Sequence, residues 1–124
     1  MILFNPPMSL APIEGIPVLD PEKLLTLPER TGVPPKDISP YHHIAAGQPP
    51  AIILHGKADA VIPFASIEAY AKATLALGNR CEVVGYDEQG HGFFNFGRAG
   101  NAMYSDTVAK VDTFLVSLGW LSAP

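Results

Sequence analysis

One stretch of the sequence decides the fold, namely Ala51-Ile52-Ile53-Leu54-His55-Gly56-Lys57-Ala58-Asp59-Ala60-Val61-Ile62-Pro63. It begins with an apolar run of strand length, which stops at the glycine turn around Gly56, and Asp59 follows just past that turn. In open α/β sheets, chemistry takes place on loops at the carboxyl ends of buried strands. The stretch therefore predicts a carboxylate in such a position.

A second loop supplies a histidine in a similar setting. His91 lies between two glycines, after the apolar run 81–86. The glycines permit unusual backbone angles and leave the imidazole unobstructed, which suits proton transfer near neutral pH. A carboxylate such as Asp59 can fix the tautomer of a histidine and stabilise its charged form. Taken singly, each residue has a plainer explanation, Asp59 as a turn former or helix N-cap and His91 as a solvated loop residue.

The composition limits the class of protein. The 124 residues fit one domain with a real core, and 48% apolar against 16% charged residues is typical of a globular chain. A net charge of −4 argues against a nucleic-acid partner. No apolar run approaches the roughly 18 to 20 residues of a membrane span, and the first five residues have no signal-peptide character. We expect a soluble protein, with the cytoplasm slightly favoured over export.

Alternating strands and helices predict an α/β fold. The predicted strands are 2–4, 51–54 and 81–86, with 2–4 fully buried, and the predicted helices are 64–77 and 102–118. The order implies about three parallel strands with flanking helices and right-handed crossovers. Apolar stripes define the inner helix faces: Ile67, Tyr70, Ala71, Thr74 and Leu75 in one, and Tyr104, Val108, Val111, Leu115 and Leu118 in the other. Trp120 and Leu121 are expected to fold back onto the body.

The segment between the first two strands is rich in breakers. Eleven of the 13 prolines lie in the first 50 residues. Such a long irregular segment is typical of a lid or binding loop. Only residues 21–27 predict a helix there, with Asp20 as its N-cap. The expected organisation is one partial domain over 1–124: a strand and a Pro-rich loop to residue 50, then acid strand, helix, histidine strand and closing helix.

Four segments resemble a known family. Residues 51–63 resemble the His-Gly-x-x-Asp-x-x-Val-Pro segment of α/β-hydrolase esterases and dienelactone-hydrolase-like enzymes, with Ile62 in place of the valine. Gly90-His91-Gly92-Phe93-Phe94-Asn95 is similar to the histidine loop of the acetyl-esterase and xylan-esterase-like branch. Residues 38–44 and 114–120 are similar to other segments of that group. The resemblance implies the C-terminal part of an α/β-hydrolase fold, with Asp59 as triad acid and His91 as triad base, and neither a cofactor nor a metal.

The nucleophile of this family has no counterpart in the sequence. No Gly-x-Ser-x-Gly occurs, and flanking glycines are missing around every serine: Ser9, Ser39, Ser66, Ser105, Ser117 and Ser122. The segment that forms the oxyanion hole is also missing. By resemblance, Met1 is expected to lie near the sixth of the family's eight strands, so that the nucleophile-bearing half is not in this chain.

Other polar and aromatic residues are weaker candidates. Adjacent His42 and His43 do not have metal-ligand spacing. His55 is expected to be a packed residue at a strand end, lining the site from below, and Cys81 a core or edge residue without a partner for a disulfide. Arg98 fits either an acidic substrate group or a solvated surface charge. Three phenylalanines after His91 fit a substrate pocket or an apolar plug equally well: Phe93, Phe94 and Phe96.

Two functional hypotheses remain. The first is a Ser-His-Asp carboxylic ester hydrolase for short acyl esters, such as acetyl groups on carbohydrates, which is inactive without its other half. The second is a non-catalytic truncated module that folds as an oligomer. In both, the resemblance to the family's sheet implies that one edge of the strand Ile2-Leu3-Phe4 is unpaired. A second copy of the chain, or a complementary N-terminal half, is the expected partner at that edge, beside a small-molecule ester substrate.

Overall fold

A three-stranded parallel sheet forms the centre of the protein. The computed structural model describes residues 1–123. Strands β1 (Ile2–Phe4), β2 (Ala51–Gly56) and β3 (Cys81–Tyr86) lie in the order β1-β2-β3. Leu3 pairs with Ile53, and Ile53 pairs with Val83, so the register runs straight across the sheet. The predicted parallel sheet is confirmed, although β2 is two residues longer than expected.

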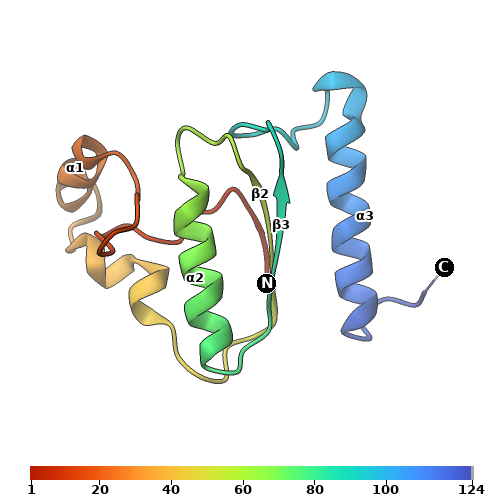
Figure 1. The fold of residues 1–124 in the computed structure, drawn as a ribbon, viewed down its shortest axis with the longest axis horizontal. Helices are drawn as coiled ribbons and strands as arrows, with labels where there is room; N and C mark the ends of the chain where they lie inside the picture. Colours follow the sequence, from red (N-terminus) through yellow and green to blue (C-terminus); the bar gives the residue numbers. More distant parts are fainter. Residues whose placement is uncertain (124) are drawn as a thin grey trace.

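Strand β2 is buried along its whole length, because helices cover both faces of the sheet. Helix α2 (Phe64–Ala76) lies on one face and helix α3 (Ala102–Ser117) on the other (Figure 1). Ala51 and Ile53 pack toward α2 in one core cluster, whereas Ile52 and Leu54 pack around Phe114 of α3 in the other. This alternation places His55 on the α2 side.

The bounds of α2 and α3 agree with the predicted helices to within one residue, but their buried faces differ from the prediction. Leu75 of α2 is 53% exposed, because it lies at the margin of the stripe that contains Ile67 and Tyr70. Tyr104 and Val108 of α3 are each 40% exposed. They line a cavity beside β1 instead of being covered.

Trp120 and Leu121, which lie beyond the end of α3, were expected to fold back onto the body, and they do not. Trp120 is 72% and Leu121 43% exposed. The backbone N–H of Trp120 donates to the carbonyl of Leu115, which closes the helix and directs the chain away from the sheet.

The Pro-rich segment contains more structure than predicted. Helix α1 (Pro21–Thr31) is followed by two 3₁₀ helices, η1 (Pro35–Ile38) and η2 (Pro40–His43). The Asp20 side chain caps α1 at Glu22 N–H, as predicted. The helix continues through Pro28, four residues beyond the predicted end, because the Gly32 N–H still donates to the Pro28 carbonyl. No residue of α1 is buried, so this helix stands off the body (Figure 1).

Strand β1 is an edge strand and is not fully buried, contrary to the prediction. Ile2 is 39% and Phe4 37% exposed, because β1 pairs with β2 on one side only. Among residues 1–123, no strand pairs with its other side, which leaves the backbone groups there free. Within residues 1–123, none of the helices is both long and apolar enough to cross a membrane.

Candidate active site

The loops that follow β2 and β3 lie against each other at the carboxyl ends of the strands. The Ala58 N–H donates to the Gln89 carbonyl at 3.0 Å, and the Lys57 N–H donates to the Tyr86 carbonyl at 2.9 Å. Gly56 makes this contact possible, since a Cβ at that position would lie 2.9 Å from the Gly90 carbonyl oxygen and closer still to Gln89. The two predicted loops are therefore joined into one unit by backbone hydrogen bonds.

Asp59 is held on three sides within this unit. Its Oδ1 accepts hydrogen bonds from the backbone N–H groups of Val61 at 2.8 Å and Ile62 at 2.9 Å. This is the turn geometry that aspartate favours, and here it orients the carboxylate. The remaining oxygen, Oδ2, lies 2.9 Å from Nδ1 of His91. The sequence motif therefore brings its two candidate residues into direct contact.

The carboxylate of Asp59 is stabilised in its charged form. Its side chain has no exposed surface. This burial acts to raise the pKa of Asp59, but the donors at Ile62, His91 and Val61 outweigh it, so that the pKa lies below its ordinary value of 3.8. Asp59 is thus a carboxylate at neutral pH.

His91 is oriented for proton transfer at its other nitrogen. A carboxylate only accepts hydrogen bonds, so Nδ1 of His91 carries the proton and donates it to Asp59. In the neutral ring, Nε2 then has a free lone pair. Among residues 1–123, no hydrogen bond reaches that nitrogen, and the side chain is 46% exposed. The arrangement can therefore take a proton from a group that approaches Nε2 and stabilise the imidazolium that results.

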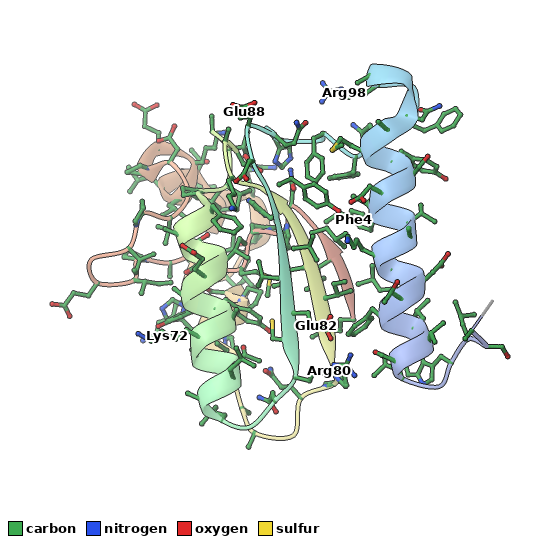
Figure 2. All side chains as sticks on the ribbon, turned by 45° about the vertical axis from the view of Figure 1, so that its right-hand side comes forward. Phe4, Lys72, Arg80, Glu82, Glu88 and Arg98 are labelled. Carbon is green, nitrogen blue, oxygen red and sulfur yellow. The ribbon has the colours of Figure 1, made fainter. Side chains whose placement is uncertain are left out.

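Arg98 supports the histidine loop, which neither of its predicted interpretations anticipated. One guanidinium nitrogen donates to the Gly92 carbonyl at 3.0 Å and lies 3.4 Å from the His91 carbonyl. Figure 2 shows Arg98 at the same end of the molecule as Glu88, away from Arg80 and Glu82. Sequence reasoning missed this contact because a lone arginine in a loop has no periodic signal.

The weaker candidates, Cys81, His42 and His43, lie among groups that do not belong to the Asp59–His91 pair. Cys81 is a buried core residue, as predicted. His42 bonds to Ser39 Oγ at 2.8 Å, and His43 bonds to the Lys36 carbonyl at 3.1 Å. Across residues 1–123, no group of three His, Cys, Asp or Glu side chains could hold a metal ion. No hydrogen bond in the same range joins a serine to His91, and Ser39 is fully buried.

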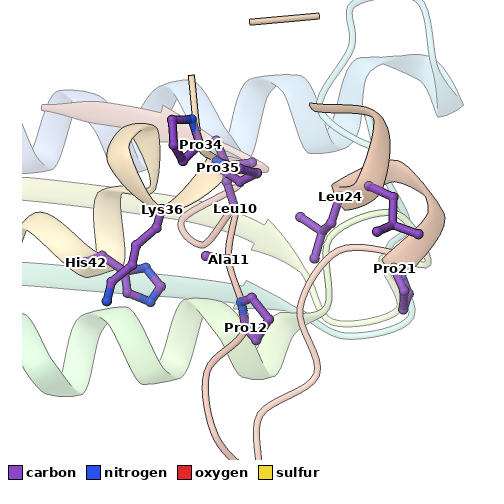
Figure 3. Close-up of a pocket in the computed structure, with 10 residues that line it drawn as sticks. Leu10, Ala11, Pro12, Pro21, Leu24, Pro34, Pro35, Lys36 and His42 are labelled. Atoms are coloured by element: carbon purple, nitrogen blue, oxygen red, sulfur yellow. The ribbon is translucent and has the colours of Figure 1, made fainter. Parts of the chain in front are cut away.

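The three phenylalanines after His91 lie in two different surroundings. Phe93 is buried and packs on Tyr86 at 4.7 Å between ring centroids, as an apolar plug. Phe94 and Phe96 line a cavity of about 280 Å³ together with Phe4 and Val108. A separate apolar cavity of about 540 Å³ lies under α1, where Leu10, Leu24 and His42 contribute to its walls (Figure 3). None of its lining residues comes from the Asp59 or His91 loop.

Comparison with known proteins identifies the family. Residues 32–123 match the dienelactone hydrolase family, a range that includes Asp59 and His91. The chain belongs to the dienelactone hydrolase family. Among curated proteins, no match was found.

Solved structures agree with this membership. Esterase 2 of the planctomycete Thermogutta terrifontis, with propionate bound, is 48% identical with a TM-score of 0.86, and the match covers 99% of this chain and 44% of that one. The same esterase phosphonylated by sarin is 46% identical over 99% of this chain and 45% of that chain, with a TM-score of 0.89. Its butyrate-bound form is 47% identical over the same shares, with a TM-score of 0.85. This member of the dienelactone hydrolase family therefore has an α/β-hydrolase-type fold and spans less than half the length of these esterases.

Proposed function

We propose that the chain provides the acid and base of a carboxylic ester hydrolase of the Ser-His-Asp type, with Asp59 as the acid and His91 as the base. The observation that carries this proposal is the 2.9 Å contact between His91 Nδ1 and the buried carboxylate of Asp59, which leaves Nε2 free. Membership of the dienelactone hydrolase family and the similarity to esterases support an ester substrate.

The proposed reaction uses His91 twice. A serine hydroxyl attacks the ester carbonyl carbon while its proton passes to Nε2 of His91. The imidazolium then donates this proton to the departing alcohol oxygen, and an acyl-serine remains. Water then attacks the acyl carbon and loses a proton to His91, and the imidazolium returns this proton to the serine oxygen as the acid is released. Asp59 stays ionised throughout and stabilises the imidazolium through the Nδ1–H bond.

The proposed substrates are esters of short acyl groups, such as acetyl groups on carbohydrates. Support comes from the similar esterase, for which propionate-bound and butyrate-bound structures exist. Both ligands are short carboxylates, the kind of product that hydrolysis of a short acyl ester releases.

The serine of this reaction is proposed to lie outside these 124 residues. None of the six serines has a nucleophile-elbow sequence. The unpaired edge of β1 is the proposed attachment point for the nucleophile-bearing segment, because a further strand there would satisfy the free backbone groups and cover Ile2 and Phe4. His91 lies in the loop next to Phe94, whose ring contacts Phe4 of β1 at 4.8 Å between centroids.

An ester-hydrolysis assay on the isolated chain tests whether the reaction needs a serine from outside these residues. We expect residues 1–124 alone to hydrolyse 4-nitrophenyl acetate and butyrate at least about 10³-fold more slowly than a complete esterase, since nucleophile and oxyanion hole are both lacking. A fluorophosphonate probe, which labels activated serines, should leave the mass of the chain unchanged. Turnover by the isolated chain that disappears in His91→Gln would contradict the proposal.

The exposed edge of β1 also favours a second candidate function, a non-catalytic module that assembles with copies of itself. In this case two β1 edges, or the apolar surface around Ile2 and Phe4, pair between chains. Light scattering at micromolar concentration should then give the mass of an oligomer, and Ile2→Lys at the edge should shift it to a monomer. A wild-type monomer at that concentration counts against self-assembly.

A further inference from the structure

His55 is a buried titratable residue to which the proposed reaction assigns no role. It lies near the end of β2 with 0% exposed surface, on the face of the sheet that packs against α2. Its ring stands 5.9 Å from the ring of Phe64, measured between centroids. The charged or titratable groups that act on it are Asp59 and His91.

One nitrogen of His55 contacts the turn that holds Asp59. Nε2 lies 2.9 Å from the carbonyl oxygen of Ile62 and 3.4 Å from Oδ2 of Asp59. Since both of these oxygens accept, Nε2 carries the proton and donates mainly to Ile62. The backbone N–H of the same Ile62 donates to Oδ1 of Asp59. His55 therefore holds Ile62 through its carbonyl, and Ile62 in turn holds the carboxylate of Asp59 through its N–H.

The other nitrogen of His55 makes no hydrogen bond within the part of the chain that the structure describes, so the bond from Nε2–H to the Ile62 carbonyl is the main polar contact of the ring. Nδ1 is buried and has no hydrogen-bond partner among residues 1–123. A buried acceptor without a partner lowers stability, by about 1 to 3 kcal/mol in general. Among residues 1–123, the polar contacts of the His55 side chain are therefore those of Nε2 alone.

His55 donates its hydrogen bond as a neutral ring, so it places no positive charge beside Asp59. Burial lowers the pKa of His55 below its ordinary value of 6.5, although the bond to Ile62 and the charge of Asp59 act in the opposite direction. The ring is therefore neutral at pH 7. A cationic ring 3.4 Å from Asp59 would compete with His91 for the carboxylate.

We propose that His55 is a positioning residue of the acid–base pair: its Nε2–H holds the Ile62 carbonyl and thereby directs Oδ2 of Asp59 at His91. The pairing role of Asp59 and His91 rests on the proposed function, whereas the geometry of the carboxylate does not depend on any activity. The proposal is tested on the isolated chain by NMR, so that absence of esterase activity and failure of this positioning role give separate results.

Three variants separate positioning from packing. His55→Gln places an amide N–H where Nε2 was, and His55→Leu removes the donor while filling the space. Ile52→Ala lowers stability from the opposite face of the sheet without touching the Asp59 turn. The readouts are the ¹³C titration of the Asp59 carboxyl, assigned with Asp59→Asn, and the low-field proton signal of His91 Nδ1–H.

We expect His55→Leu to raise the pKa of Asp59 by about one unit, because the donors at Ile62 and His91 loosen, and to broaden the His91 signal beyond detection. His55→Gln should restore both readouts to within about 0.3 pH unit of wild type, and Ile52→Ala should change neither. If His55→Leu does not fold, His55→Asn serves as the donor-free variant. The asparagine amide is too short to reach the position of Nε2, so the same two changes are expected. An Asp59 titration unchanged in the donor-free variant, or shifted equally in His55→Gln, overturns the proposal.

Discussion

His91→Gln is expected to lower kcat/KM for ester hydrolysis by about 10³ to 10⁶ in a complete enzyme built on this chain. The suitable enzyme is a chimera in which residues 1–124 are joined to the part of Thermogutta terrifontis esterase 2 that this chain does not cover. Glutamine keeps a polar side chain but cannot carry a proton between serine and alcohol. The measurement is the rate of 4-nitrophenyl butyrate hydrolysis over a range of substrate concentrations.

The contact between Asp59 and His91 also predicts how the effects of the single and double variants combine in the same chimera. Asp59→Asn should lower the rate less than His91→Gln does, and the double variant should be no slower than His91→Gln alone, because Asp59 acts only through His91. His43→Gln is the control, since the imidazole of this exposed histidine bonds to the Lys36 carbonyl and not to Asp59 or His91. Multiplicative losses in the double variant would mean that the two residues act independently.

Gly56→Ala is expected to destabilise the isolated chain by about 3 kcal/mol or more. The new Cβ would overlap the carbonyl of Gln89 and lie 2.9 Å from the carbonyl oxygen of Gly90. Both obstacles are backbone atoms, so that relief requires the two loops to separate. Urea unfolding measures the loss, and the His91 Nδ1–H signal should weaken with it as the loops part.

Gly90→Ala is the matched control for this effect. It lies in the partner loop and has the same change in side chain, but its Cβ would meet only the Ala58 carbonyl oxygen at 3.9 Å, an ordinary contact. We expect a change of less than about 1 kcal/mol. Equal stability of Gly56→Ala and Gly90→Ala would show that the loops do not interlock as described.

Much of the site could be predicted because each of its two residues follows a strand that the sequence itself indicates. Asp59 and His91 each follow an apolar strand, and parallel strands place their carboxyl ends at one edge of a sheet. Strand β2 and the bounds of α2 and α3 follow from apolar runs and periodicity. The contact between the two side chains then needed only that the strands be neighbours, which they are.

The contacts that support the site could not be predicted, because they depend on how irregular loops and turns fold, for which the sequence has no periodic pattern. Arg98 reaches the carbonyls of the His91 loop from six and seven residues away, and no spacing rule predicts this. Gly56 was interpreted as a turn residue, although the closeness of Gln89 is what excludes a side chain there. His55 was predicted to be packed, and it is, but its bond to Ile62 depends on how the turn folds back.

The prediction of the buried face of α3 was partly wrong, because it assumed that a neighbour covers the whole apolar stripe. A stripe of apolar residues predicts the face that packs on a core only where a neighbour covers it. Tyr104 and Val108 lie in the N-terminal half of α3 beside a cavity that Phe4 of β1 also lines, and no further element among residues 1–123 covers them. The same absence of a neighbour exposes Ile2 and Phe4, which were predicted to be buried.

The central claim is that this chain holds a preassembled acid and base that act on a serine supplied from outside it. The most direct measurement compares initial rates of 4-nitrophenyl butyrate hydrolysis by residues 1–124, by the complementary part of Thermogutta terrifontis esterase 2, and by the chimera of the two. The account predicts turnover only by the chimera, and its loss on His91→Gln. Equal rates in the chimera with and without His91, or matching turnover by residues 1–124 alone, would contradict it.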